Sequence, residues 1–267
     1  MSLHWKEATS TTLYNLITST RMGLITDMDG TISPIVDNPE DAIVTPRNRK
    51  LLRQLQEKLS LVSVVSGRSV RSVTARMQIP GVVYIGNHGL ERCVGGQVRY
   101  NFDVEKYRPM LESAMRELQA ITLDGVRVED KGLTVTLHYR QTEEPQLVRN
   151  QLLSRVQEIA TQQKLDFFEG RMIFELRPPV NADKGSAFEG LVLEFSLDSA
   201  LYIGDDTTDI TALQKARQMR QEKMCYAVGV GVVSDEHPKI LPTVADLWVV
   251  GVPEVENLFA WILENRE

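Results

Sequence analysis

The sequence predicts an α/β fold with a doubly wound, mainly parallel sheet as its core and a smaller inserted α+β domain. Three short apolar runs have the length of buried strands, and helical patterns separate them: 24–26, 61–65 and 82–85. Near residue 103 the pattern changes to paired strands with single helices, and the first pattern returns near residue 180. We therefore expect a Rossmann-like core at 1–102 and 180–267 and an insert at 103–179.

The first half of the core contains one strongly marked helix. Thr45 is a good N-cap residue, and Pro46 suits the first helical position, where an N–H group would have no partner. Four leucines then form an apolar stripe at helical spacing: Leu51, Leu52, Leu55 and Leu59. We expect the other core helices at 4–20, 69–77, 184–194, 207–217 and 253–264, and further strands at 200–203, 225–229 and 246–250.

The insert shows the two-residue period of strands that have one dry face. In the stretch 133–140, three polar residues alternate with three apolar ones: Thr134, Thr136 and His138 against Leu133, Val135 and Leu137. We expect helices at 105–120 and 144–162 to cover the dry face, and further strands at 126–130, 165–169 and 171–176. The polar face is either simply solvated or a surface for a ligand rich in hydroxyl groups.

The composition argues against several classes of protein. Lys and Arg total 30 against 36 Asp and Glu, and a net charge of −6 disfavours a nucleic-acid-binding surface. Cys93 and Cys225 match no redox or zinc spacing. No apolar run is long enough to span a membrane, and the first residues lack the apolar core of an export signal. We therefore expect a cytoplasmic protein that acts on a small molecule.

Polar residues gather at or just after the carboxyl ends of predicted core strands, the edge at which doubly wound sheets bind ligands. They are Asp27 and Asp29, Ser66, Lys184 at a helix start, and Asp205, Asp206 and Asp209. Taken singly, each fits a helix cap or a turn. Together they crowd several carboxylates, and two charges about 4 Å apart repel by roughly 4 kcal/mol at an effective dielectric near 20. A bound cation removes this repulsion, and such ligands suit Mg²⁺ better than Zn²⁺ or Ca²⁺.

These residue types fit phosphoryl transfer through an aspartyl phosphate. Asp27 is the expected nucleophile and Asp29 the proton shuttle. Lys184 and the cation offset the negative charge of the phosphate, and Ser66 with N–H groups near Gly30 and Gly67 could hold its oxygens. The sequence has no G-x-x-x-x-G-K-[ST] motif, and Ser66 lacks the first glycine of G-x-S-x-G. Neither a P-loop nor a serine hydrolase is therefore favoured.

Four motifs, in this order, give the chain a resemblance to the haloacid dehalogenase superfamily: Asp27-Met28-Asp29-Gly30-Thr31, Ser66, Lys184, and Gly204-Asp205-Asp206-Thr207-Thr208-Asp209. The insert resembles the type-two cap of that superfamily. Within it, the chain is similar to the trehalose-6-phosphate phosphatases. That similarity is carried by short stretches: Ser66-Gly67-Arg68, Asn87-His88-Gly89-Leu90-Glu91, Glu129-Asp130-Lys131, His138-Tyr139-Arg140, Glu175-Leu176-Arg177-Pro178 and Asp183-Lys184-Gly185.

The resemblance implies roles for the acidic residues. Asp27 would attack phosphorus and bind Mg²⁺. Asp29 would protonate the leaving sugar oxygen, deprotonate the hydrolytic water and offer its backbone carbonyl to the metal. Asp205 would be the third protein ligand, with Asp206 or Asp209 just outside the ligand set. The implied reaction is the Mg²⁺-dependent hydrolysis of trehalose 6-phosphate to trehalose and phosphate, a step of trehalose biosynthesis.

The resemblance also implies which residues hold the substrate. Ser66, Gly67 and Lys184 would bind the phosphate group. The sugar-side contacts would be Arg68, His88, Glu91, Glu129, Lys131, His138, Arg140 and Glu175.

Other interpretations stay open. A phosphatase of another sugar or glycosyl phosphate would keep the same core and differ only in the cap residues. A phospho-acceptor signalling domain also uses Asp, Ser, Lys and Mg²⁺, but it does not need Asp29 as acid and base. A catalytically inactive relative that binds sugar phosphate fits less well, because the acidic set is complete.

Overall fold

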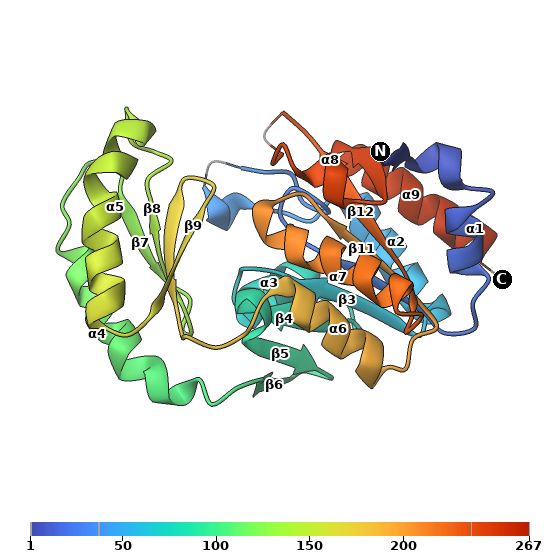
Figure 1. Cartoon of the computed structure of the whole chain (residues 1–267), viewed down its shortest axis with the longest axis horizontal. Coiled ribbons are helices and arrows are strands. Elements are labelled where there is room, and N and C mark those ends of the chain that lie inside the picture. Colours follow the sequence, from blue (N-terminus) through green and yellow to red (C-terminus); the bar gives the residue numbers. More distant parts are fainter. Residues whose placement is uncertain (1, 37, 236, 267) are drawn as a thin grey trace. The chain divides into compact units, whose positions relative to one another are not determined.

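The computed structural model describes residues 2–36, 38–235 and 237–266. The chain forms two compact units (Figure 1): Met1–Arg99 with Ala182–Glu267, and Tyr100–Asn181. We call the first unit the core and the second the insert. The predicted class, an α/β fold with a mainly parallel sheet and a separate inserted antiparallel sheet, is confirmed. The domain limits expected from the sequence stay a prediction.

The core is built on one sheet whose central strands are parallel and buried. In the part of the chain that the structure describes, its nine strands lie in the order β1-β13-β12-β11-β2-β3-β4-β5-β6. Every neighbouring pair from β1 to β4 is parallel, and β5 is antiparallel to β4. The bounds are β1 (Leu3–His4), β2 (Met22–Thr26), β3 (Leu61–Val65), β4 (Val83–Gly86), β5 (Glu91–Val94), β6 (Gln97–Tyr100), β11 (Ser199–Gly204), β12 (Tyr226–Val233) and β13 (Leu247–Val250). The chain extends the sheet first to one side of β2 and later to the other. The switch point, where such sheets bind ligands, therefore lies between the carboxyl ends of β2 and β11.

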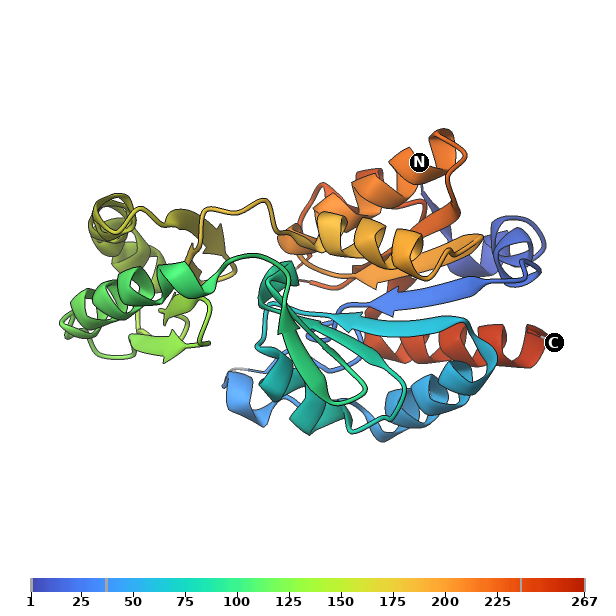
Figure 2. The same cartoon turned by 90° about the horizontal axis from the view of Figure 1, so that it is seen from below.

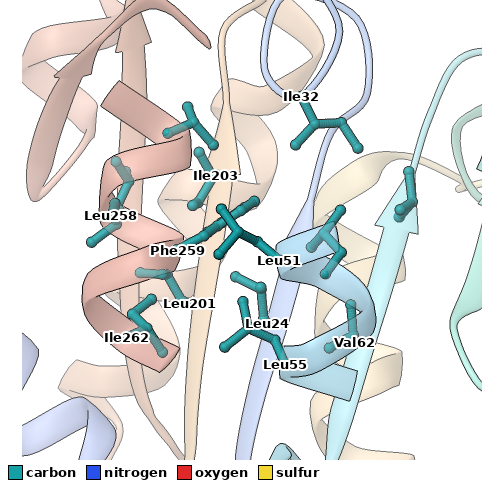
Figure 3. Close-up of a cluster of buried hydrophobic side chains, with 14 of the residues drawn as sticks. Leu24, Ile32, Leu51, Leu55, Val62, Leu201, Ile203, Leu258, Phe259 and Ile262 are labelled. Carbon is teal, nitrogen blue, oxygen red and sulfur yellow. The ribbon is translucent and has the colours of Figure 1, made fainter. Parts of the chain in front are cut away.

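Helices cover both faces of this sheet (Figure 2). One face carries α1 (Thr12–Ile17), α2 (Pro46–Lys58), α3 (Val70–Met77) and α9 (Gly251–Asn265), and the other carries α6 (Lys184–Glu194), α7 (Ile210–Gln221) and α8 (Leu241–Val244). Figure 3 shows Leu55 of α2 and Phe259 of α9 in the cluster that contains Leu24 of β2 and Leu201 of β11. Full burial of such a side chain contributes about 1.5–3 kcal/mol, so this layer is a major source of stability. No helix in the described ranges is both long and apolar enough to cross a membrane.

The first turn of α2 confirms the predicted cap. Thr45 Oγ1 accepts a hydrogen bond from the N–H of Asn48 at 3.1 Å, and Pro46 is the first helical residue. Such a cap stabilises a helix by about 1 kcal/mol. All four leucines of the predicted stripe are buried.

Some core elements differ from the prediction. In place of the single helix expected at 4–20, the structure has the 3-10 helix η1 (Trp5–Ala8) and α1. His4 belongs to β1, which pairs with β13. The structure also adds α8 and the edge hairpin β5–β6. The turn of that hairpin contains Gly95 and Gly96, with φ of 56° and 80°. A Gly-Gly pair between two strands is the local signal that could have predicted it.

The insert is a four-stranded antiparallel sheet with two helices on one face. Its order is β7-β8-β10-β9, with bounds β7 (Arg127–Asp130), β8 (Val135–His138), β9 (Asp166–Gly170) and β10 (Ile173–Arg177). The 3-10 helix η4 (Glu105–Tyr107) leads into α4 (Arg108–Gln119), and α5 (Pro145–Gln162) follows β8. Glu175 lies opposite Thr136, and Thr136 lies opposite Glu129. The other face buries Val135 and Phe174 against α4 and α5, so the predicted polar–apolar alternation is confirmed.

Candidate metal and phosphate centre of the core

Asp27 and Lys184 form a buried ion pair at the switch point. Asp27 directly follows β2, and its N–H donates to the carbonyl oxygen of Ile203 in β11 at 2.8 Å. Lys184 is the first residue of α6, whose start is capped by Asp183. The Lys184 Nζ atom lies 2.9 Å from Asp27 Oδ1, and the lysine is only 2% exposed. The predicted nucleophile and the predicted phosphate-binding lysine are therefore in direct contact.

Asp209 accepts hydrogen bonds at both of its carboxylate oxygens. Its Oδ1 accepts from Lys184 Nζ at 2.8 Å and from the Tyr202 hydroxyl at 2.6 Å. Its Oδ2 accepts from the backbone N–H groups of Asp205 and Asp206 at 3.2 and 2.9 Å. Asp209 is fully buried and belongs to the 3-10 helix η5 (Thr207–Asp209). It therefore holds the loop that presents Asp205.

Three buried carboxylates meet at this point. Asp27, Asp205 and Asp209 each offer one oxygen, and these oxygens lie within 4.8 Å of one another. Burial raises the pKa of Asp27 well above its ordinary value against the lowering effect of Lys184, and Asp209 and Asp205 raise it further. Burial alone would lower the pKa of Lys184, but Asp209 and Asp27 raise it above its ordinary value, so the lysine stays charged. These four side chains carry an excess of two negative charges when all are ionised.

The donor set fits a hard divalent cation. The candidate ligands found among the described residues are carboxylates alone, which favours Mg²⁺ over Zn²⁺. Gly30, in the loop after β2, has a φ of 80°, and a Cβ built on it would lie 2.2 Å from Asp205 Oδ2. Glycine therefore lets the Asp205 carboxylate come close to the loop that carries Asp27. The residues that the sequence assigned to a metal are compatible with one.

Asp29, the predicted proton shuttle, is paired with Arg68. Two parallel hydrogen bonds join them, from Arg68 Nε to Asp29 Oδ2 at 2.6 Å and from Nη2 to Oδ1 at 2.9 Å. A bidentate pair of this kind fixes the orientation of the carboxylate. The sequence placed Arg68 among the sugar contacts, and the structure places its guanidinium against a predicted catalytic residue. Its sugar contact stays a prediction.

The loops after β3 and β4 bring Ser66, Gly67 and His88 together. The His88 N–H donates to the Ser66 carbonyl oxygen at 3.0 Å. A Cβ on Gly67 would lie 2.6 Å from the His88 ring atoms Cε1 and Nε2, so the imidazole lies directly against this glycine. His88 has a φ of 57°, which is uncommon for a residue with a side chain. Two predicted phosphate-binding residues and one predicted sugar contact are therefore neighbours within the core.

Glu91 connects the loop after β4 to the start of α3. Its Oε1 accepts from the N–H of Val70, the first residue of α3, at 2.8 Å and from Asn87 Nδ2 at 2.7 Å. The carboxylate is buried and lies at the N-terminus of a helix, where a negative charge is stabilised. These bonds hold the residue that precedes His88. The predicted sugar contact of Glu91 is not tested by them.

Glu175 is the centre of a second buried charge cluster, in the insert. Its side chain is 1% exposed, and its Oε1 accepts from Lys131 Nζ at 2.9 Å. Its Oε2 accepts from Arg177 Nε at 2.6 Å, and the hydroxyls of Thr134 and Thr136 donate to Oε1. The guanidinium of Arg177 also stacks on a ring, that of Phe168, with 4.1 Å to the centroid.

Two further predicted residues of the insert pair with each other. His138 Nε2 and Glu129 Oε2 lie 2.8 Å apart on the neighbouring strands β8 and β7. Arg140 follows β8 and is half-buried. The predicted polar face therefore carries side chains that hydrogen-bond one another, and its contact with a ligand stays a prediction.

Tyr202 is a residue of the core site that sequence reasoning missed. It lies in the middle of β11 and is fully buried, with its hydroxyl on Asp209. The available signal was a tyrosine in the otherwise aliphatic run Ala200–Ile203, just before the acidic motif. A buried tyrosine hydroxyl usually has a hydrogen-bond partner, and the acids that follow this strand were candidates for it.

A family model described as Trehalose-phosphatase matches residues 25–240. The chain is similar to the "Probable trehalose-phosphate phosphatase J" of Arabidopsis thaliana, 29% identical over 259 residues, which covers 90% of this chain and 67% of the relative. It is 34% identical over 199 residues to the "Trehalose-phosphate phosphatase" of Mycobacterium avium (strain 104), which covers 72% of this chain and 50% of the relative. The chain spans about half to two thirds of the length of the curated relatives it matches.

Solved structures are similar over nearly the whole chain. A "trehalose-6-phosphate phosphatase related protein" has a TM-score of 0.76 at 25% identity, covering 91% of this chain and 97% of that one. The C-terminal domain of a C. albicans trehalose-6-phosphate phosphatase has a TM-score of 0.78 at 19% identity, covering 99% and 98%, and shows the same fold. The family model spans the whole insert and the motifs on both sides of it. The chain belongs to the trehalose-phosphatase family, as its sequence motifs predicted.

Proposed function

We propose that this protein is a Mg²⁺-dependent phosphatase that hydrolyses trehalose 6-phosphate to trehalose and phosphate through an aspartyl phosphate on Asp27. The observation that carries the proposal is the buried group of Asp27, Asp205, Asp209 and Lys184, which has more negative than positive charge. A site of this composition takes up a cation and a phosphate together. Family membership supports the choice of substrate.

The reaction has two steps on the same phosphorus atom. The Asp27 carboxylate attacks phosphorus, the bond from phosphorus to the sugar oxygen breaks, and Asp29 gives its proton to that oxygen. Asp29 then takes a proton from water, the water oxygen attacks phosphorus, and the bond to Asp27 breaks. Free phosphate leaves, and both carboxyl groups return to their starting states.

Arg68, Lys184 and Ser66 would support these steps. The bidentate contact of Arg68 would hold the ionised Asp29 carboxylate, the form that takes a proton from water, in one orientation. Lys184 stays charged and offsets the negative charge that the phosphate brings to Asp27. Ser66 and the N–H of Gly67 would hold phosphate oxygens.

Asp27, Asp205 and the backbone carbonyl of Asp29 would hold Mg²⁺. The ion would supply positive charge to the phosphoryl group during transfer. Asp209 would stay outside the ligand set, because its two oxygens already accept four hydrogen bonds. Asp206 would likewise act on the loop, as its side chain caps η5.

The sugar would be recognised by polar side chains at which hydroxyl groups can replace or extend existing hydrogen bonds. The charged network around Glu175 in the insert supports this assignment. The proposed contacts are Arg68, His88, Glu91, Glu129, Lys131, His138, Arg140 and Glu175.

The test is phosphate release from trehalose 6-phosphate with Mg²⁺ and after chelation, beside the variant Asp27→Asn. We expect turnover only with Mg²⁺, and a loss of more than about a thousandfold in the variant, since no other group can form the covalent intermediate. Trehalose 6-phosphate cleaved no faster than glucose 6-phosphate would replace this substrate by another sugar phosphate. A phosphoryl group that stays on Asp27 for minutes would instead indicate a signalling domain.

A further inference from the structure

Tyr202 places a buried hydroxyl group beside the acidic cluster. Its ring lies edge-on against Phe188 of α6, with 5.7 Å between centroids and an interplanar angle of 85°. Its hydroxyl donates to Asp209 Oδ1 at 2.6 Å. The ring is therefore held by the hydrophobic core, and its polar end reaches the site.

The hydrogen bonds of Asp209 show what this hydroxyl does. Oδ1 is shared by Tyr202 and Lys184, while Oδ2 is held by the N–H groups of Asp205 and Asp206. If the hydroxyl is removed, Oδ1 keeps the hydrogen bond from Lys184 and loses the one from Tyr202. The carboxylate could then rotate and follow the lysine, which also contacts Asp27.

The hydroxyl is a permanent donor. Burial raises the pKa of Tyr202 well above its ordinary value, and the neighbouring charge of Asp209 raises it further. Tyr202 therefore keeps its proton throughout the neutral range, and its hydrogen bond to a carboxylate is of the stronger, charge-assisted kind.

We propose that Tyr202 is a positioning residue for the hydrolysis: its hydroxyl fixes Asp209, and Asp209 holds both Lys184 beside Asp27 and the loop that carries Asp205. This inference rests on the proposed function and adds a residue to it. The Tyr202 hydroxyl bonds Asp209, so its effect on the reaction would pass through that carboxylate.

The test compares Tyr202→Phe with Tyr84→Phe, a matched control in β4. The Tyr84 hydroxyl is also buried, but it bonds the backbone of Ile79, at 2.9 Å to the carbonyl oxygen and 3.2 Å to the N–H. Both variants remove one oxygen and leave the ring in place. Four quantities are measured for each variant: the melting temperature, Mg²⁺ binding by calorimetry without substrate, and kcat and KM for trehalose 6-phosphate and for p-nitrophenyl phosphate.

We expect Tyr202→Phe to lower kcat about tenfold and to weaken Mg²⁺ binding severalfold, with KM changed by less than about threefold, as for a lost hydrogen bond to a charged group. Tyr84→Phe should lower the melting temperature by a similar amount and leave kcat and Mg²⁺ binding unchanged. If both variants lose only stability, Tyr202 is a structural residue and the inference is overturned.

A double-mutant cycle with Asp209→Asn tests the route through Asp209. If Tyr202 acts through that carboxylate, Tyr202→Phe should change kcat and Mg²⁺ binding by less than about twofold in the Asp209→Asn background. Effects that multiply would overturn the inference. If the unaltered protein hydrolyses neither ester, the proposed function fails, and Mg²⁺ binding alone decides the role of Tyr202. A protein that also binds no Mg²⁺ overturns both.

Discussion

The core and the insert each bury a carboxylate against a lysine, but the two clusters differ in the sign of their remaining charge. In the core, Lys184 faces Asp27 and Asp209, with Asp205 beside them. In the insert, Glu175 faces both Lys131 and Arg177 and also accepts from threonine hydroxyls. With every group ionised, the first set has an excess of two negative charges, and the second has an excess of one positive charge.

The difference in charge suggests that the core cluster needs a bound cation, whereas the Glu175 cluster of the insert is stable without one. Buried charges are tolerated when they are paired and hydrogen-bonded. Glu175 meets that condition within the insert. In the core cluster three carboxylates share one lysine, and a divalent cation would offset the excess of negative charge that the cluster has when all its groups are ionised. A net negative charge, rather than burial of charge as such, is what marks the core cluster as a candidate cation site.

The largest expected effect comes from removing one carboxylate of the core cluster. Asp205→Asn should weaken Mg²⁺ binding at least tenfold and lower kcat at least about a hundredfold, beyond the loss typical of residues outside the ligand set. Without Mg²⁺ the variant should melt no lower than the unaltered protein, because repulsion is relieved. Asp206→Asn is the control, since asparagine caps a helix as well as aspartate does. Equal losses in both variants would contradict the assigned metal ligand.

Crowding the core cluster should have the next largest effect. Gly30→Ala adds a methyl group 2.2 Å from Asp205 Oδ2 at a φ of 80°, so backbone strain and steric overlap combine. We expect a loss of about 3 kcal/mol in unfolding free energy together with loss of Mg²⁺ binding. Gly96→Ala has the same φ of 80° but open space around it, and it should cost only about 1 kcal/mol. Chemical denaturation and Mg²⁺ calorimetry measure both changes; similar costs would show that Asp205 can move freely.

In the insert, removing the negative charge of Glu175 should destabilise the fold more than removing the positive charge of Lys131. Glu175→Gln removes the carboxylate that Lys131 and Arg177 share. We expect a loss of about 2 kcal/mol, less than the roughly 3–5 kcal/mol typical of removing one partner of a buried ion pair, because glutamine keeps some hydrogen bonds. Lys131→Met leaves Glu175 with Arg177 as a neutral pair and should cost below about 1 kcal/mol. Hydrogen exchange of the amides in β8 and β10 reports these losses. If Lys131→Met is less stable than Glu175→Gln, the insert cluster does not have the excess of positive charge assigned to it.

The smallest effect concerns pH. The pKa of Asp27 is raised in the folded chain, so the folded state binds a proton there that the unfolded state has released. The protonated Asp27 side chain therefore makes its full contribution to the unfolding free energy in acid. That contribution is lost as the pH rises from the ordinary pKa of an aspartate toward the raised pKa of Asp27. Without Mg²⁺, the melting temperature of Asp27→Asn minus that of the unaltered protein should grow over this range, and Mg²⁺ should reduce it. If the melting temperatures of the two proteins change with pH by the same amount, the pKa of Asp27 is not raised in the folded chain and the prediction is wrong.

Local patterns were sufficient for much of the fold. The core strands are continuous apolar runs because both faces of a parallel sheet are covered, and Leu61–Val65 was predicted with its observed bounds. The cap at Thr45 could be predicted because it depends on neighbouring residues alone: a hydroxyl side chain directly before a proline favours a helix start. The edge hairpin was missed although its Gly-Gly turn is a local signal. The strand β1 could not be predicted, because Leu3–His4 forms it by pairing with a strand about 240 residues away.

The sequence by itself determined that Asp27 and Asp29 follow a buried strand and that Asp205 and Asp209 follow another. Only the tertiary structure decided that β11 lies directly beside β2, so that these acids meet around Lys184. It also paired Arg68 with Asp29 and aimed the Tyr202 hydroxyl at Asp209. The physical reason is that periodicity along the chain records whether a side chain is buried. Which other side chain it meets there depends on the order of strands in the sheet and on the packing of helices against it.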